Sequence, residues 1–316
     1  MSRIDILLAT YNGARYLPEQ LASLSAQRHK DWRLLVRDDG SSDNSLDVVR
    51  EWAGSIAQPV DIIEDGRTGL GASLNFAALL EASDAPYFAC CDQDDVWLPG
   101  KLSVMLKAVQ SEEDSAPGQE PVLAFSDLEV VDGALRPLAA SFWEMSKLAT
   151  DPVDLTIDRL MLRNVATGCA ILGNARLRDL ALPIPPGARM HDWWLMMVGA
   201  GLGTCVPVPE TTVRYRQHGG NVVGASASGS LALLSRFAGD PRFALNKTLA
   251  ARDNSQRQAA AFAERYGARL NTAEMHVVRE YGAISRRRWW QRKTFLIRHR
   301  LGLGSPIYFL ALLAVM

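Results

Sequence analysis

The chain of 316 residues and 34.6 kDa, with 48% hydrophobic and 22% charged residues, can bury a large core and has an ordinary globular composition. Its formal net charge of −1 gives no global reason to expect a nucleic-acid partner. The four cysteines lack metal-ligand spacing and the N-terminus lacks a signal-peptide pattern, so we expect reduced, buried thiols in a cytosolic protein that is not secreted.

Alternating strand and helix patterns fill the first third of the chain. The apolar runs that predict strands lie at residues 4–8, 32–37, 60–64 and 87–91. The patterns that predict helices lie at residues 17–24, 45–52 and 73–82. Turn-forming residues separate these segments. This order predicts an α/β fold with a mostly parallel sheet and helices on both faces.

Polar clusters follow the first, second and fourth predicted strands, at residues 10–13, 38–43 and 92–95. In sheets of this kind, ligands bind at the carboxyl ends of the strands. We therefore expect the three clusters to converge in one crevice, although they are far apart in the chain.

The rest of the chain continues the sheet and then becomes helical. Further strands are predicted at residues 122–125, 165–172, 204–208 and 211–217. An apolar helix opens at His191, and from about residue 231 the whole pattern is helical. We expect one large domain over residues 1–225 and a helical C-terminal region over residues 226–316.

The cluster at residues 92–95 contains two carboxylates that are spaced by one residue. Side chains alternate along a strand, so Asp92 and Asp94 could point the same way and share one hard cation, Mg²⁺ or Mn²⁺. Such a cation offsets charge that develops on a departing diphosphate. The alternative is a solvated acidic turn that caps the helix beginning near Pro99. The position after an apolar strand, within an α/β order, favours the metal site.

Five motifs follow one another in a characteristic order. They are residues 9–13 (ATYNG), 38–43 (DDGSSD), 69–76 (GLGASLNF), 92–99 (DQDDVWLP) and 216–221 (RQHGGN). In this order they resemble glycosyltransferase family two, the large group with the GT-A fold, and within it bacterial rhamnosyltransferases of surface-polysaccharide assembly. The resemblance covers residues 3–225. It implies a Rossmann-like, mostly parallel central sheet flanked by helices, here with a C-terminal helical extension.

The resemblance also implies which residues bind the donor. Thr10 and Asp39 would contact the nucleoside base, and Asp92 would help to hold the donor ribose. Asp94 would be the preferred metal ligand. Independently, a carboxylate such as Asp39 can accept a hydrogen bond from the imide N–H of uracil or thymine but not from the ring nitrogen of cytosine, which favours a UDP or dTDP donor. A capping role in its turn is the alternative. The other donor-binding candidates are Tyr11, Asn12, Gly71, Asn75, Gln93 and Arg216.

An inverting displacement at the anomeric carbon needs a carboxylate on the face opposite the diphosphate to take the proton of the acceptor hydroxyl. Asp192 fits because a loop precedes it and an apolar helix follows, and it matches the base position of the family. The alternative is an N-cap aspartate. Arg216 would suit the diphosphate. His218 resembles a late histidine that completes the metal shell in some relatives, and a structural role is its alternative.

The C-terminal tail is basic and aromatic. Residues 281–316 contain seven Lys and Arg residues and no Asp or Glu. Trp289, Trp290 and Phe295 interleave with these charges, and the apolar run at residues 306–316 is shorter than the span of about 20 residues that a membrane requires. Either the tail is an interfacial anchor on anionic lipid, or its aromatic and terminal residues pack on the large domain.

Together, the patterns predict a metal-dependent, inverting hexosyltransferase. It would move a sugar, with rhamnose implied by the resemblance, from a dTDP- or UDP-sugar to a saccharide or lipid-linked acceptor in cell-surface polysaccharide synthesis. We expect a cytoplasmic protein, and the anchor alternative for the tail would place it on the inner face of the cytoplasmic membrane. Two alternatives remain open, a metal-dependent nucleotidyltransferase and a non-catalytic sugar-nucleotide-binding or assembly protein.

Overall fold

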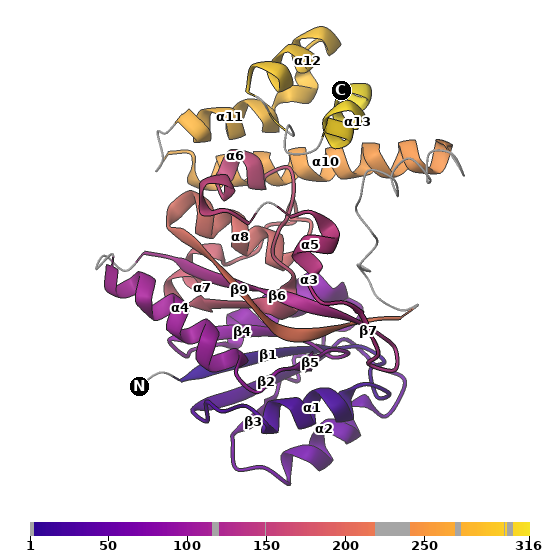
Figure 1. Cartoon of the computed structure of the whole chain (residues 1–316), viewed down its shortest axis with the longest axis vertical. Helices are drawn as coiled ribbons and strands as arrows, with labels where there is room; N and C mark the ends of the chain where they lie inside the picture. Colours follow the sequence, from indigo (N-terminus) through magenta and orange to yellow (C-terminus); the bar gives the residue numbers. More distant parts are fainter. Residues whose placement is uncertain are drawn as a thin grey trace. The chain divides into compact units, whose positions relative to one another are not determined.

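The computed structural model describes residues 3–115, 120–148, 150–218, 241–268, 273–299, 301 and 306–316. The chain divides into two compact units, whose elements are labelled in Figure 1. The sheet unit comprises Met1–Phe142, Ala166–Ile184 and Met190–Gly224. The helical unit comprises Trp143–Val165, Pro185–Arg189 and Ala225–Met316. The two units therefore interleave along the sequence.

The first half of the sheet is parallel. Its strands are β1 (Ile4–Thr10), β2 (Trp32–Asp38), β3 (Val60–Ile62) and β4 (Tyr87–Asp92), in the order β3-β2-β1-β4. They alternate with the helices α1 (Leu17–Ser25), α2 (Ser45–Ala53) and α3 (Gly71–Ala82). All of these predicted strands and helices are confirmed, and their bounds differ from the expected ones by two residues or fewer.

Local sequence explains why these elements form. Leu17, Leu21 and Leu24 recur at helical spacing and are fully buried on one side of α1. Pro18 stands at the start of this helix, where its missing N–H costs no hydrogen bond. The strand β1 is an almost continuous buried run, which is typical of a parallel strand covered on both faces.

The second half of the sheet is mixed. There β4 pairs antiparallel with β8 (Ile171–Asn174), and β8 pairs antiparallel with β6 (Val122–Asp132). The long β9 (Thr204–Gln217) runs parallel to β6 and ends the path beside β5 (Val96–Trp97), while β7 (Pro137–Ala139) pairs with β6. The two longest ladders, β6 with β9 and β1 with β2, are both parallel, which agrees with the predicted sheet.

Two details of this half differ from the expectation. The strands predicted at 204–208 and 211–217 are one strand, β9, whose register against β6 shifts opposite Ser126 to Leu128. The run predicted as a strand at 165–172 pairs only from Ile171, because Gly168–Ala170 form a 3-10 turn, η2. A Cβ atom on Gly168 would lie 3.1 Å from Nε2 of His191, so this turn brings the backbone close to that ring.

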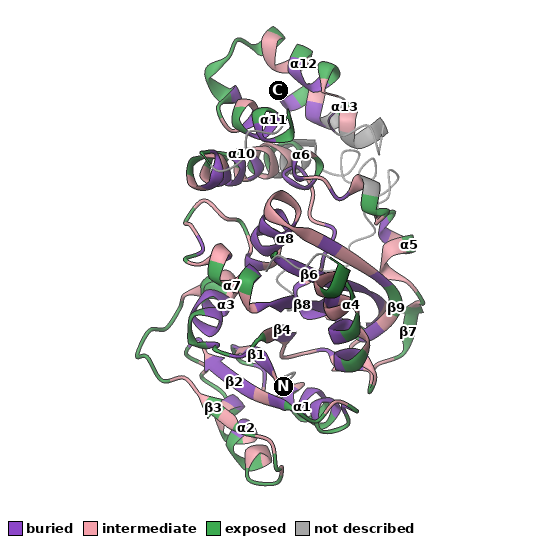
Figure 2. Ribbon diagram, turned by 90° about the vertical axis from the view of Figure 1, so that its left-hand side faces the viewer, coloured by how far each residue is buried: buried purple, intermediate pink, exposed green. Residues whose placement is uncertain are grey.

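Helices flank the sheet. The helix α4 (Lys101–Ser115) packs on β6, β8 and β9, and α3 packs on β1 and β2. The helix α8 (His191–Leu202) packs on β6, β9, α3 and α7 (Ala175–Ala181), and the indole N–H of Trp194 donates to the carbonyl of Ala181 at 2.9 Å. Figure 2 shows buried residues concentrated on the central strands and on α8, whereas most residues of α2 are intermediate or exposed. All four cysteines are free and buried, as expected.

The helical unit has a core of its own. Its elements are α5 (Phe142–Ser146), α6 (Ile157–Leu160), α10 (Pro241–Tyr266), α11 (Ala273–Gly282), α12 (Trp289–Arg298), α13 (Pro306–Val315) and the 3-10 turns η1 (Pro152–Asp154) and η3 (Ile284–Arg286). Phe262, Met275 and Tyr281 are almost fully buried among them, and the hydroxyl groups of Tyr281 and Ser255 are 2.7 Å apart. Among the described helices, none is both long enough and apolar enough to cross a membrane.

Candidate active site

The carboxyl ends of β1, β2 and β4 meet at one edge of the sheet, as the sequence predicts. The side-chain amide of Gln93, after β4, accepts from the backbone N–H of Tyr11 at 2.9 Å and donates to its carbonyl at 3.0 Å. The hydroxyl of Thr10, at the end of β1, donates to Oδ1 of Asp38 at 2.8 Å. These bonds connect the ends of three strands, so the polar clusters form a single site.

The loop after β1 is held by the loop after β2. The backbone of Asn12 has a φ of +49°, and its side-chain Oδ1 accepts from the N–H of Ser42 at 2.8 Å. The N–H of Asn12 in turn donates to the hydroxyl of Ser41 at 2.8 Å. Asn12 therefore fixes the shape of the two loops on the side of the site where the nucleoside is expected.

Asp39 binds the start of α3. Its carboxylate accepts from the backbone N–H of Leu70 at 2.8 Å and of Gly71 at 2.7 Å, and the residue is 6% exposed. A carboxylate is favourable there because the first N–H groups of a helix lack intrahelical partners and carry partial positive charge. Each oxygen has more than one acceptor site, so Asp39 can also receive a donor base.

Asn75 and Arg37 form a buried pair beneath this helix start. Nη1 of Arg37 donates to Oδ1 of Asn75 at 2.9 Å, and Nδ2 of Asn75 donates to the carbonyl of Arg37 at 3.2 Å. The Arg37 guanidinium also donates to Asp65 at 2.8 and 3.1 Å and lowers the pKa of that carboxyl group. The sequence reasoning did not select Arg37, although an arginine inside an apolar strand is a signal of a buried polar network.

Asp94 lies against His218. Oδ2 of Asp94 is 2.7 Å from Nε2 of His218, and the imidazole stacks on Tyr16 with ring centroids 4.5 Å apart. These two groups, 124 positions apart in the chain, are the ones that sequence reasoning assigned to a common metal site. The residues 219–221 that complete the last motif lie outside the described part of the chain.

Arg216 holds the loop that carries Asp94. Its Nε donates to the carbonyl of Asp94 at 2.7 Å, its Nη1 to the carbonyl of Gly133 at 2.9 Å, and its Nη2 pairs with Glu19. The backbone N–H of Arg216 donates to Oδ1 of Asp95 at 2.9 Å. The guanidinium is 2% exposed, so it holds the loop of Asp94 from the buried side.

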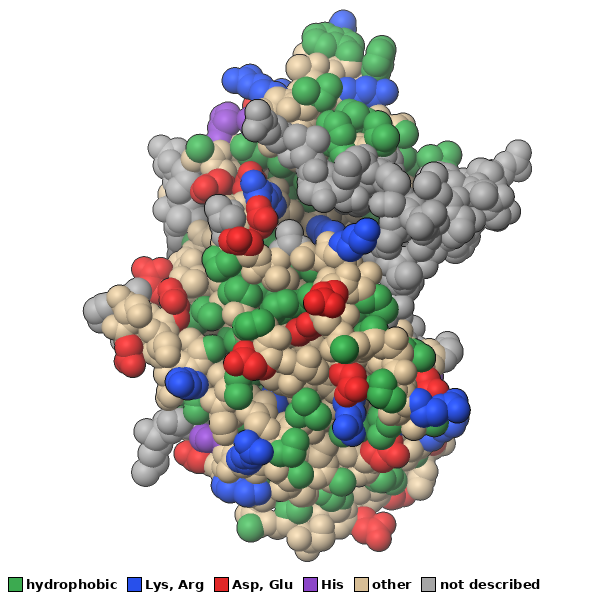
Figure 3. All heavy atoms as spheres, in the orientation of Figure 1, with side chains coloured by type: hydrophobic (Ala, Val, Ile, Leu, Met, Phe, Trp, Pro, Cys, Tyr) green, Lys and Arg blue, Asp and Glu red, His purple; other side chains and the backbone are tan. Residues whose placement is uncertain are grey.

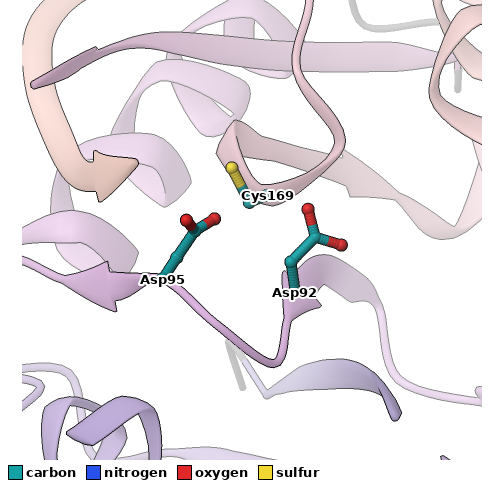
Figure 4. Close-up of side chains that lie close together, drawn as sticks. All are labelled: Asp92, Asp95 and Cys169. Carbon is teal, nitrogen blue, oxygen red and sulfur yellow. The ribbon is translucent and has the colours of Figure 1, made fainter. Parts of the chain in front are cut away.

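Asp92 gathers with Asp95 and Cys169, as Figure 4 shows. One ligand atom from each lies within 4.8 Å of the others. Burial, and then the charge of the neighbouring carboxylates, raises the pKa of Asp92 well above its ordinary range and that of Asp95 to about 7. Sequence reasoning overlooked Asp95, because full burial of one acid in a run of acids is a tertiary property.

Lys101 supplies the positive charge below this cluster. It is 1% exposed, its ammonium group donates to the carbonyl of Cys169, and it lies 3.6 Å from the centre of the Trp97 ring. Burial lowers the pKa of Lys101 to about 8, and its charge lowers the pKa of both Asp92 and Asp95. Sequence reasoning did not select this lysine, since it reads as an ordinary polar residue at a helix start.

The acidic side chains fit a hard divalent cation. Asp94 lies with His218, whereas Asp92 lies with Asp95 and Cys169. Carboxylate oxygens and an imidazole nitrogen are ligands that suit Mg²⁺ or Mn²⁺. Burial, and then the neighbouring carboxylates, raises the pKa of Asp92, and the charge of a bound cation would oppose that shift. Burial raises the pKa of the Cys169 thiol well above its ordinary range, so the thiol is protonated when no metal is bound.

Asp192 enters the site from α8. It is the second residue of this helix, whose N-cap is Met190, and its Oδ1 accepts from the N–H of Trp193 at 2.6 Å. Its charge contributes to the raised pKa of Asp92, so the two carboxylates belong to one electrostatic environment. The turn residue Gly168 borders Asp192, and its neighbour Cys169 borders the acidic cluster.

His191 lies beside Asp192 and is buried. It is 2% exposed, its ring stacks on Phe76 with centroids 3.9 Å apart, and neither ring nitrogen has a hydrogen-bond partner. Burial lowers the pKa of His191 to about 3, so the imidazole is neutral at physiological pH.

Comparison with known proteins identifies the sheet unit. Residues 5–151 match the model of Glycosyl transferase family 2. An uncharacterized glycosyltransferase of Nostoc sp. is 25% identical over 311 residues, which cover 97% of this chain and 90% of that protein. The dTDP-rhamnosyl transferase RfbG of Shigella flexneri is 34% identical over 98 residues, which cover 30% of this chain and 34% of that enzyme.

Two solved structures share the fold. A fragment of TarS from S. aureus in complex with UDP-GlcNAc aligns with a TM-score of 0.56 at 15% identity, covering 99% of this chain and 90% of that one. The mannosyltransferase PcManGT from Pyrobaculum calidifontis, in complex with GDP-Man and Mn²⁺, aligns with a TM-score of 0.50 at 16% identity, covering 98% and 86%.

These likenesses, together with the sheet order, define an α/β transferase with the fold of GT-A glycosyltransferases. The match to glycosyl transferase family 2 lies in residues 5–151, and together with the full-length similarity to the Nostoc glycosyltransferase it supports membership of that family.

Proposed function

We propose that this chain is a metal-dependent, inverting glycosyltransferase that uses a dTDP- or UDP-sugar. The observation that carries the proposal is the convergence of the ends of β1, β2 and β4, with Asp94 held against His218 and Asp192 entering from α8. Rhamnose is the proposed sugar, because the sequence resembles rhamnosyltransferases and a dTDP-rhamnosyl transferase is among its relatives.

The donor nucleotide would lie between the loops after β1 and β2. Thr10, Tyr11 and Asn12 would form one wall and Asp39 with Gly71 the other, while Asn75 would support the start of α3 from beneath through its bonds to Arg37. The Asp39 carboxylate would accept the imide N–H of uracil or thymine while it keeps its bonds to α3. Gln93 and Arg216 would act by holding the loops in place, since their polar groups bind Tyr11 and the Asp94 loop.

Asp94, Asp92 and His218 would hold Mg²⁺ or Mn²⁺ next to the donor diphosphate. Bound there, the cation offsets the negative charge of the leaving nucleoside diphosphate. The neighbour in complex with Mn²⁺ supports divalent metal use in this fold group. Arg216 keeps the carbonyl and side chain of Asp94 in position, because it anchors the same loop to Gly133 and Glu19.

Asp192 would act as the general base. Its carboxylate takes the proton of the acceptor hydroxyl, the hydroxyl oxygen forms a bond to the anomeric carbon, and the bond from that carbon to the diphosphate oxygen breaks. Attack from the face opposite the diphosphate inverts the anomeric configuration. The acceptor would be a saccharide or a lipid-linked saccharide of the cell envelope. Catalysis would reside in residues 1–225, and residues 226–316 would contact the inner face of the cytoplasmic membrane.

Thermal unfolding with a panel of donors tests this proposal. A ligand that binds only the folded state stabilises it by about 2.7 kcal/mol at one hundred times its Kd. We expect dTDP-rhamnose or a UDP-sugar to raise the Tm in the presence of Mn²⁺ and to have little effect with EDTA. Asp94→Asn should lose the metal-dependent part, whereas the control Asp47→Asn, at a 77% exposed side chain of α2, should behave as the wild type.

The panel also distinguishes the alternatives. Donor binding without sugar transfer to any acceptor would indicate a binding protein, and release of pyrophosphate from a nucleoside triphosphate would indicate a nucleotidyltransferase. If no nucleoside-diphosphate sugar stabilises the chain with either metal, the proposed function is wrong.

A further inference from the structure

The helix α12 has two apolar sides, of which only one is packed. On its inner side, Phe295 and Leu296 are buried at 4% and 0% exposure. Phe295 stacks with Tyr281 of α11 at a centroid distance of 6.5 Å. A helix of this kind normally presents polar residues on its outer side. Apolar residues on the outer side of α12 would therefore indicate a binding surface.

The outer side of α12 exposes large apolar side chains. Trp289 is 66% exposed, Trp290 is 48% exposed and Ile297 is 59% exposed. At about 100° per residue, these three positions fall within an arc of about 100° around the helix axis. We call this set, Trp289, Trp290 and Ile297, the tryptophan face. Exposed tryptophans gathered in one place are rare on monomeric soluble proteins and mark interaction sites.

Basic groups surround the tryptophan face. The side chains of Arg286, Arg288 and Arg298 are exposed, and the ammonium group of Lys293 lies 5.4 Å from the centre of the Trp289 ring. Figure 3 shows hydrophobic and basic side chains together over the part of the molecule that Figure 1 labels α12. Residues 281–316 contain no Asp or Glu, so this stretch carries only positive side-chain charge.

Glu280 of α11 is an acidic residue near the start of α12. Glu280 pairs with Arg287 at 2.9 Å and lies 3.8 Å from His276. It offsets the charge of Arg287 and leaves the charges of Arg286, Arg288, Lys293 and Arg298 around the tryptophan face. The region therefore favours an anionic partner.

The apolar terminal helix α13 is packed on another helix, unlike the tryptophan face. In α13, Leu312 and Val315 are buried at 3% and 7% exposure, Met316 directly after it is 5% exposed, and the helix packs on α10. The guanidinium of Arg252 donates to the carbonyl of Val315, and the amide of Gln256 lies 3.6 Å from Sδ of Met316. The terminal helix thus packs on α10 within the helical unit, whereas the tryptophans of α12 are exposed.

We propose that the tryptophan face is a binding surface for an anionic lipid bilayer. The indole rings and Ile297 enter the boundary between headgroups and acyl chains, where tryptophan is favoured because it is apolar with one polar N–H. The arginines and Lys293 meet the lipid phosphates. This orientation lays α12 flat on the membrane, as in interfacial amphipathic helices.

The inference names the surface for the membrane contact included in the proposed function, and it deepens that function without depending on catalysis. A bilayer explains the tryptophans and the cations together, whereas a second copy of this chain would bring the same positive charges face to face. Binding to lipid would concentrate the enzyme where a lipid-linked acceptor is found.

Flotation with vesicles tests the inference on the full chain. We expect the wild type to float with phosphatidylglycerol–phosphatidylcholine vesicles at low salt and to remain in the bulk with pure phosphatidylcholine. Trp289→Ser combined with Trp290→Ser should reduce the floated fraction at least tenfold. Arg286→Gln combined with Arg288→Gln should reduce it most at low salt, where charges are least screened. The control Leu138→Ser, at a 60% exposed position of β7, should float as the wild type does.

Three outcomes would overturn the inference. The first is a wild type that stays in the bulk with anionic vesicles, and the second is a double tryptophan variant, shown to be folded by circular dichroism, that floats as well as the wild type. Light scattering could also reveal a wild-type dimer that the tryptophan variant abolishes, which would make the face a contact between copies. Donor-dependent stabilisation is measured without lipid, so its loss would count against the proposed function and not against this surface.

Discussion

Replacing His191 with leucine should change how the stability of the protein depends on pH. The imidazole is 2% exposed, stacks on Phe76 and has no hydrogen-bond partner for either nitrogen. Burial lowers its pKa from the ordinary value of 6.5 to about 3. Below pH 6.5 the unfolded chain therefore takes up a proton at His191 that the folded chain does not bind.

The sign and size of the effect follow from this difference in proton binding. Between pH 6.5 and 3 the unfolded state binds more protons, so the free energy of unfolding decreases as the pH falls. One pKa unit corresponds to about 1.4 kcal/mol. At about pH 5 the wild type should thus lose about 2 kcal/mol through His191, relative to about pH 7.5. Leucine binds no proton, so His191→Leu should lose about 2 kcal/mol less.

Urea unfolding at the two pH values, followed by far-UV circular dichroism, measures this difference. Contributions from other titrating groups cancel, because both proteins contain them. His276→Leu makes the same change at a side chain that is 71% exposed, and it should keep the pH dependence of the wild type. Equal losses of stability in the wild type and His191→Leu would refute the reasoning.

Two further substitutions test the packing of the sheet and the order of the site. Gly173→Ala should lower the free energy of unfolding by about 1–3 kcal/mol in urea, because the added Cβ would lie 2.7 Å from Cζ of Phe88 in a filled core; an unchanged midpoint would contradict this. Gln93→Leu should weaken donor binding about 30-fold in calorimetry while the fold remains intact, because two hydrogen bonds to the Tyr11 backbone are worth about 1 kcal/mol each. Unaltered affinity would show that this loop is ordered by other contacts.

Local pattern was sufficient to predict the first half of the fold. The strands β1 to β4 are buried apolar runs bounded by turn formers, and such signals lie within a few neighbouring residues. The insertion of β8 between β4 and β6 was not predictable, because strand order depends on contacts between distant segments. The 3-10 turn at Gly168–Ala170 was missed for the same reason, since the ring of His191 beside it is supplied by another helix.

The site was partly predictable from the sequence. The convergence of the clusters follows from strand topology alone, and the contact between Asp94 and His218 agrees with the motif order. The burial of Lys101 and Asp95 was not predictable, because charged residues are normally exposed and only the assembled fold brings these two charges beneath the site. Arg216 was expected at the diphosphate, and its bonds to Asp94 and Gly133 could be found only from the structure.

Sugar transfer by the wild type and by Asp192→Asn tests the central claim most directly. The assay uses the donor that stabilises the protein, Mn²⁺ and a bacterial membrane extract as the source of acceptor, and it measures release of nucleoside diphosphate together with sugar incorporation. We predict that Asp192→Asn binds the donor with unchanged affinity and transfers the sugar about 10² to 10⁴ times more slowly, because the general base is lost. Transfer by Asp192→Asn at the wild-type rate would contradict the account.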